Sequence, residues 1–151
     1  MSDTDKAMRQ AVAGMPVPEF ETTAFTLPPP LSEASVAIVT SAALHVEGEP
    51  GFEASDPQLK ALDDGARNLR LGHFSPNFDR GAYASDLNVV YPVDRLHELA
   101  ERGVIGRVAP RHYSCAGNQD ETVSRLRLDT GPEAAKQMLA DGVNVVLLAP
   151  V

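Results

Sequence analysis

The chain has 151 residues, of which 43% are hydrophobic and 23% charged, a composition typical of a globular protein with one domain-sized core. The net charge of -8 and the 5% aromatic content, without tryptophan, argue against a nucleic-acid partner, because phosphate binding needs Lys and Arg and base binding needs aromatic stacking. No apolar run reaches the ~18 residues of a membrane span, no secretory leader is evident, and one cysteine suits a reducing compartment, so we expect a cytoplasmic protein with no membrane partner.

The first thirty residues are interrupted by prolines, at Pro16, at Pro18 and in the triplet 28–30. We expect residues 1–30 to form an extended, Pro-rich arm and residues 31–151 to form a single α/β domain. The run 34–44 is apolar and β-branched, which predicts a buried strand of the kind found in parallel sheets.

From residue 45 to residue 80 the chain is rich in Gly, Pro, Asp and Asn, which predicts a long loop with one short strand around 68–71. The second half is more regular. Apolar spacing predicts a helix over 94–102 that ends at Gly103, followed by a short strand over 104–110.

A capping-box spacing at 130–133 predicts a second helix that ends near Gly142, and the run 143–149 predicts a final strand. Strands that alternate with helices are the pattern of an open, mostly parallel sheet. We therefore expect an α/β fold with flanking helices, Rossmann-like or flavodoxin-like, that ends at a strand.

The common nucleotide, redox-pair and zinc-protease motifs are absent from the sequence. Among the four histidines, His97 is expected on the exposed face of a helix, whereas His45 and His73 follow apolar segments and could reach the carboxyl edge of the sheet. No pair of potential ligands has the local spacing of a metal site, so we expect no metal and treat these histidines as hydrogen-bonding residues.

The densest polar cluster is the segment 111–117, Arg-His-Tyr-Ser-Cys-Ala-Gly, which we expect directly after a strand that ends at Pro110. One interpretation is a functional loop in which Cys115 is a nucleophile whose pKa is lowered by Arg111 and His112. The other is a well-bonded structural turn, with Cys115 as a small buried residue.

Several segments resemble, in chain order, the selenoprotein B family of glycine, sarcosine, betaine and D-proline reductases. The most specific are DLNVVYPVDRL at 86–96 and APRHYS at 109–114, and they are accompanied by 31–40, by Leu44-His45, by Asp56-Pro57, by 101–106 and by 141–151. The resemblance covers about residues 30–151.

The resemblance implies a reaction and its partners. A partner subunit carries a pyruvoyl group that holds the amine substrate, a selenocysteine or cysteine of the B-type subunit attacks the activated α-carbon, and a thioredoxin-like protein supplies reducing equivalents. In family members the nucleophile follows the final strand. We therefore expect selenocysteine, encoded by UGA, directly after Val151, with the 151-residue reading frame ending at that codon; the alternatives are a natural fragment or a paired gene that supplies the nucleophile in trans.

The resemblance also implies roles for residues within this chain, which is expected to bind no cofactor itself. Arg111, His112 and Tyr113 would lie beside the nucleophile and support it, or orient a substrate carboxylate. Residues that match the family or lie near the same edge are candidates for substrate binding: His45, His73, Asp86 and Asn88. Asp94 and Arg95 also match the family, but an Asp-Arg pair at a helix start is equally typical of a structural brace.

Two other classes of function stay open at this point. A chain that ends in an apolar strand exposes a face suited to association, so the protein could be a non-catalytic scaffold subunit or a homo-oligomer. An independent thiol enzyme built on Cys115 is the third interpretation.

Overall fold

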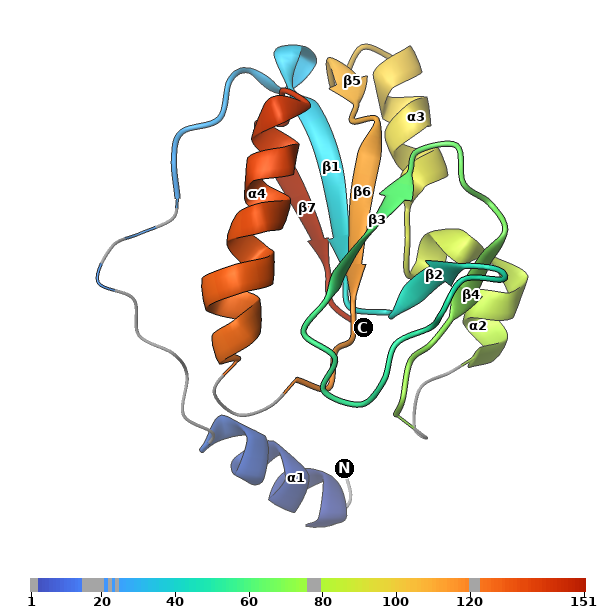
Figure 1. Ribbon diagram of the computed structural model, residues 1–151, viewed down its shortest axis with the longest axis vertical. Helices are drawn as coiled ribbons and strands as arrows, with labels where there is room; N and C mark the ends of the chain where they lie inside the picture. Colours follow the sequence, from blue (N-terminus) through green and yellow to red (C-terminus); the bar gives the residue numbers. More distant parts are fainter. Residues whose placement is uncertain (1–2, 15–20, 22, 24, 76–79, 120–122) are drawn as a thin grey trace.

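The computed structural model describes residues 3–14, 21, 23, 25–75, 80–119 and 123–151. A five-stranded sheet lies at its centre (Figure 1). Strand β1 (Ser35–Thr40) runs parallel to β5 (Arg107–Val108), β6 (Arg111–Cys115) and β7 (Val145–Ala149). The fifth strand, β3 (Leu59–Asp63), pairs antiparallel with β6. The expected α/β class with an open, mostly parallel sheet is thus confirmed.

Both faces of β1 are covered, as its continuous apolar sequence predicts. On one face Ala37 packs with Tyr113 and with Met138 of helix α4 (Gly131–Ala140). On the other face Ile38 packs in a larger cluster that includes Leu96 of helix α3 (Val93–Glu101). The two helices therefore lie on opposite sides of the sheet, and the core is divided between them (Figure 1).

Smaller elements complete the side that carries α3. Strands β2 (Leu44–Val46) and β4 (Leu69–Leu71) form a separate antiparallel pair, and helix α2 (Arg80–Ser85) follows them. Short 3₁₀ turns at Leu31–Glu33 and Leu87–Val89 precede β1 and α3.

Several boundaries differ from the sequence predictions. Strand β1 ends at Thr40, and of the predicted strand 34–44 only Leu44 belongs to β2. It follows Ala43, which has a positive φ of 55°. The region 45–80, predicted as one long loop around a short strand, contains β2 and β3 as well as the predicted β4. The sequence of β3, Leu-Lys-Ala-Leu-Asp, has neither a continuous apolar run nor a regular alternation, and the strand is held by its pairing with β6.

The expected capping box at Thr130 is wrong. Residues Leu126–Thr130 already form a π-helical turn that leads into α4, and Thr130 has helical backbone angles. Its hydroxyl donates to the Pro57 carbonyl instead of capping the helix. By contrast, α3 ends as predicted, with Gly103 at a φ of 69° just past its C-cap.

The N-terminal segment also differs from an extended arm. Helix α1 (Asp3–Ala13) forms within it, with Asp3 and Asp5 in its first turn, where the helix dipole favours negative charge. This helix precedes the first proline of the chain; Pro16 and Pro18 lie outside the described residues. The division into an arm and one domain stays a prediction.

Candidate functional site

The carboxyl ends of three parallel strands meet at one edge of the sheet. Thr40 of β1 pairs with Ser114 of β6 on one side and with Ala149 of β7 on the other. The residues that follow, Ser41 and Val151, therefore emerge together at this edge, where α/β folds place their functional groups.

The main chain at Val151 is held by two side chains from other elements. The Val151 N–H donates to Ser41 Oγ at 2.8 Å, and the same hydroxyl is 3.4 Å from Val151 O. The Nε2 atom of His73 lies 3.2 Å from Val151 O. The end of β7 is thus fixed by the turn after β1 and by the segment after β4.

His73 reaches this edge, as the sequence analysis predicted. Its Nδ1 accepts a hydrogen bond from Ser75 N–H at 3.2 Å, so the Nε2 atom is the one that carries the proton toward Val151 O. Arg80 donates to the His73 carbonyl at 2.8 Å. The imidazole is thus contacted at both ring nitrogens, and Arg80 holds the main chain of the same residue.

His45 lies close to this segment but is not among the residues that hold Val151. It belongs to β2, opposite Arg70, and its Nδ1 is 3.3 Å from the Ala43 carbonyl. Gly72 lies between the two histidines: a Cβ there would be 2.9 Å from Ala43 O and 3.7 Å from the His45 ring. The absence of a side chain at Gly72 lets the segment carrying His73 pack directly on the turn after β1.

Cys115 ends β6 near the same edge, with its Sγ 3.7 Å from Thr40 O. Burial raises the pKa of this thiol, and the positive groups expected to lower the pKa are not its contacts. A thiol in this state is a poor nucleophile, so its environment does not favour the interpretation as an independent thiol enzyme.

The segment Arg111–Cys115 is strand β6 itself, so the expected loop after a strand ending at Pro110 is wrong. Arg111 stands at the start of this strand, away from the carboxyl edge. Its guanidinium forms a two-pronged ion pair with Asp141, with both contacts at 2.8 Å. The hydrogen bonds between the two side chains are the main cause that lowers the pKa of Asp141 and raises the pKa of Arg111.

His112 fills a gap in the sheet. The Pro110 carbonyl accepts a hydrogen bond from Asp64 N–H rather than from β1. The Ile38 N–H of β1 lies between the residues that pair with β5 and those that pair with β6. This N–H donates to His112 Nδ1 at 3.0 Å. The side chain is fully buried, and its Nε2 lies 3.2 Å from an Asp64 oxygen. Burial is the main cause that lowers the pKa of His112, opposed by the hydrogen bond to Asp64.

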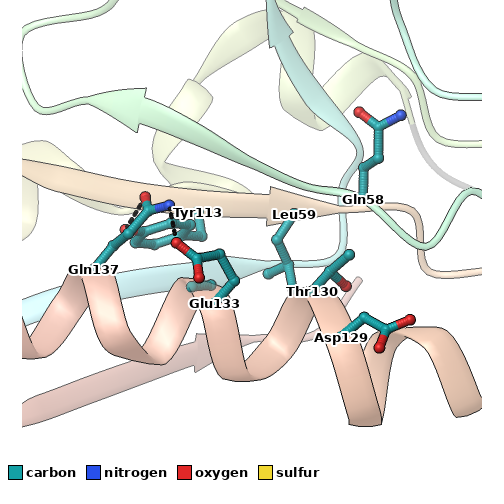
Figure 2. A pocket seen from close by; sticks show the side chains of 8 residues that line it. Gln58, Leu59, Tyr113, Asp129, Thr130, Glu133 and Gln137 are labelled. Carbon is teal, nitrogen blue, oxygen red and sulfur yellow. Dashed lines mark hydrogen bonds between the residues drawn. The ribbon is translucent and has the colours of Figure 1, made fainter.

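Tyr113 points to the opposite face of the sheet, where it borders a hollow of about 350 Å³ beside α4 (Figure 2). Its hydroxyl donates to Gln137 Oε1 at 3.2 Å, and Gln137 Nε2 donates to Glu133 at 3.3 Å. Burial raises the pKa of Tyr113. The other residues of the lining come from the start of β3 and of α4: Gln58, Leu59, Asp129, Thr130 and Ala134.

The size and polar lining of this hollow suit a small polar molecule. Of the residues that line the hollow, Tyr113 was a candidate from the sequence, whereas Gln137 and Glu133 were not. Their one-turn spacing on a helix was the available signal, but it is equally typical of an exposed helix face.

Asp86 and Asn88, which the sequence offered as candidates for substrate binding, form a hydrogen-bonded turn just before α3. The Asp86 carboxylate accepts from the backbone and side-chain N–H groups of Asn88, both at 2.9 Å, and these hydrogen bonds lower the pKa of Asp86. Asn88 also bonds to the side chain and backbone of Asp94. His97, on the same helix, bonds to Asp64 at 2.9 Å with a partly exposed side chain.

Within the described ranges, no group of three or more His, Cys, Asp or Glu residues is arranged to hold a metal ion. In the same part of the chain, no helix is both long and apolar enough to cross a membrane.

The open, mostly parallel sheet with flanking helices places the chain among α/β proteins, in which functional groups commonly lie at the carboxyl edge of the sheet. The particular family follows from comparison with known proteins. The sequence model of the family described as glycine/sarcosine/betaine reductase selenoprotein B (GRDB) matches residues 9–151, and the chain belongs to this family.

Three curated relatives show the breadth of the family. The D-proline reductase subunit gamma of Acetoanaerobium sticklandii is 30% identical over 121 residues, which are 78% of this chain and 49% of the relative. The glycine reductase complex component B subunit gamma of Peptoclostridium acidaminophilum is 32% identical over 130 residues, or 78% of this chain and 28% of the relative. The sarcosine reductase complex component B subunit beta of the same organism is 28% identical over 124 residues, again 78% and 28%.

The chain thus spans half or less of the length of these relatives. No solved structure matches it. The names of these relatives describe them as components of reductase complexes, which agrees with the family resemblance found in the sequence.

Proposed function

We propose that this chain is part of a B-type subunit that reductively cleaves the C–N bond of an amino acid or amine of the glycine, sarcosine, betaine or D-proline type. One observation carries the proposal: the family match extends through β7 to Val151, which lies two residues past that strand and contacts Ser41 and His73 at the carboxyl edge. Relatives that act on three of these substrate types match the same region, so the choice among substrates is left to experiment.

The proposed nucleophile is a selenocysteine or cysteine directly after Val151. A selenolate at that point would lie beside a hydroxyl and an imidazole N–H, and groups of this kind favour an anionic neighbour. We further propose that the codon after Val151 is UGA. Determining the nucleotides that follow tests this: UGA with an in-frame continuation supports it. A cysteine codon refutes UGA but agrees with a thiol nucleophile, and a sense codon for any other residue refutes both.

The proposed partners are a pyruvoyl-containing subunit, further reductase components and a thioredoxin-like reductant in the cytoplasm. The decisive assay isolates the native complex with this subunit and supplies each of the four substrates with a dithiol reductant. Formation of the cleaved product from at least one substrate supports the function: ammonia from glycine, methylamine from sarcosine, trimethylamine from betaine, or the ring-opened 5-aminopentanoate from D-proline. Formation of none of these products refutes it.

A second candidate, a non-catalytic scaffold subunit, is favoured by the open edge of β7. In the described sheet β7 pairs only with β1, and three of its apolar side chains are substantially exposed: Val146, Leu147 and Leu148. Mass spectrometry of the native subunit separates the candidates. A 16.1 kDa product in the assembled complex favours the scaffold, and a longer selenium-containing product favours the catalytic subunit.

A further inference from the structure

A second hollow lies between the segment that precedes β3 and the helical turn that leads into α4. Its volume is about 670 Å³, within the range of small-molecule sites. It is lined by residues 50–51 and 53–58, by Lys60 and by Arg125. The first residue of β3, Leu59, pairs with Cys115 at the end of β6. The segment before β3 therefore lies at the carboxyl end of β6, and the hollow lies beside the carboxyl edge of the sheet.

The wall of the hollow that precedes β3 is fixed to the segment after β6. Gln119 Nε2 donates to the Asp56 carbonyl at 2.7 Å and to the Ala116 carbonyl at 2.8 Å. The Ser55 hydroxyl donates to the Asn118 carbonyl at 3.3 Å. This wall is thus shaped before any ligand binds, which lowers the ordering cost of binding.

Four charged side chains line the hollow, two of each sign: Lys60, Arg125, Glu53 and Asp56. In the described part of the chain, none of the four forms an ion pair with another. The two carboxylates belong to one turn, which is closed by a hydrogen bond of 3.2 Å from the Asp56 N–H to the Glu53 carbonyl. The two cations come from other elements, β3 and the helical turn before α4. Opposite charges therefore face the same hollow without neutralising each other.

The two cations are available to a ligand in different ways. The Lys60 ammonium donates to the Pro50 carbonyl and lies 5.1 Å from the centroid of the Phe52 ring, so its position is fixed while further N–H donors remain. The Arg125 side chain is exposed, and within the described ranges its guanidinium forms no hydrogen bond. A guanidinium with free N–H groups can bind a carboxylate through two parallel hydrogen bonds.

This pattern of charge selects among ligands. A simple anion would be attracted by the two cations and repelled by the two carboxylates, and a simple cation would meet the reverse. A molecule that carries one charge of each sign can contact both pairs favourably.

We propose that this hollow binds a small amino acid in its zwitterionic form, with the carboxylate at Arg125 and Lys60 and the positive nitrogen toward Glu53 and Asp56. The four substrate types of the proposed reaction all carry both charges, and the step from ligand to substrate rests on that proposed function. Because Arg125 and Glu53 are exposed, water screens these contacts, and the dissociation constant is expected in the millimolar range.

The test titrates glycine into the purified 151-residue chain and follows the amide NMR signals of residues 53–60 and 125. Acetate, which lacks the nitrogen, and methylammonium, which lacks the carboxylate, are titrated for comparison. The variants are Arg125→Gln, Arg125→Lys and Glu53→Gln. Arg102→Gln is the matched control, because that arginine is also exposed but lies at the end of α3 and does not line the hollow.

Glycine should shift these signals, and Arg125→Gln should raise its dissociation constant about fivefold or more. Arg125→Lys should give an intermediate value, because it keeps the charge and loses the two-pronged contact. Glu53→Gln should weaken glycine about twofold without weakening acetate, and Arg102→Gln should change nothing. The absence of glycine-dependent shifts, equal dissociation constants in Arg125→Gln and Arg102→Gln, or acetate or methylammonium binding as tightly as glycine overturns the inference.

Cleavage assays on the native complex separate failure of this site from failure of the proposed function. If glycine binds the chain as expected while the complex cleaves none of the four substrates, the proposed function fails and the site stands. If the complex cleaves a substrate while the chain binds no glycine, the site is refuted and the proposed function stands.

Discussion

Replacing His112 tests whether a buried imidazole completes the central sheet. In His112→Ala the Ile38 N–H loses the Nδ1 atom that accepts its hydrogen bond at 3.0 Å, and an unpaired buried donor costs about 1–3 kcal/mol. The edge-on contact with Tyr91, at 5.4 Å between ring centroids, is lost as well, which adds about 1 kcal/mol. We expect the free energy of unfolding to fall by about 2–4 kcal/mol.

A graded set of variants isolates the hydrogen bond from the packing. In His112→Asn the side-chain oxygen occupies the position of Nδ1 and can still accept from Ile38, so this variant should recover about 1 kcal/mol relative to alanine. His97→Ala is the control, because its partly exposed imidazole bonds to the same Asp64 carboxylate; it should cost less than about 1 kcal/mol.

The assay is urea unfolding of the purified chain followed by circular dichroism, with hydrogen exchange of the Ile38 amide as the local readout. Exchange should be fast in His112→Ala and slow in His112→Asn. An asparagine variant no more stable than the alanine variant, together with equal exchange at Ile38, would refute the role of the imidazole in the ladder.

Three further predictions concern charge, backbone packing and the open edge. Because burial lowers the pKa of His112 in the folded chain, the unfolded chain binds the proton first, so the free energy of unfolding should fall as the pH drops below about 6.5. Urea midpoints measured from about pH 5 to 8 should show this dependence, and it should be weaker in His112→Asn. Gly72→Ala places a Cβ 2.9 Å from a backbone oxygen and should lower the free energy of unfolding by about 1–3 kcal/mol. Gly65→Ala, whose Cβ would have no atom within 4 Å, should leave the thermal midpoint nearly unchanged, and equal midpoints for the two variants would contradict the close approach at Gly72. Leu148→Lys on β7 should reduce concentration-dependent association, measured by sedimentation velocity, more than the control Leu128→Lys, whose leucine has the same 69% exposure but lies outside the sheet. Equal effects of the two variants would argue against the β7 edge as the contact surface.

Residue patterns in the sequence predicted part of the site at the carboxyl edge. The resemblance located the family, and the position of His73 after an apolar segment correctly suggested the carboxyl edge. Its partner Ser41 was missed because the apolar run 34–44 conceals the end of β1, and a serine within such a run gives no signal of its own. Arg111 and His112 were expected beside the nucleophile, yet the strand that contains them places them earlier along the sheet.

By itself, the sequence determined the α/β class, the central strand, the helix ending at Gly103, the last strand and the family, because these depend on local periodicity or on matching segments. Tertiary structure alone decided that β3 joins the sheet and that His112 replaces a backbone acceptor. It also brought Ser41 and His73 together on Val151. These features depend on strand pairing between segments far apart in the chain, and the free energy of such pairing is set by the partner strand rather than by the residues of one segment.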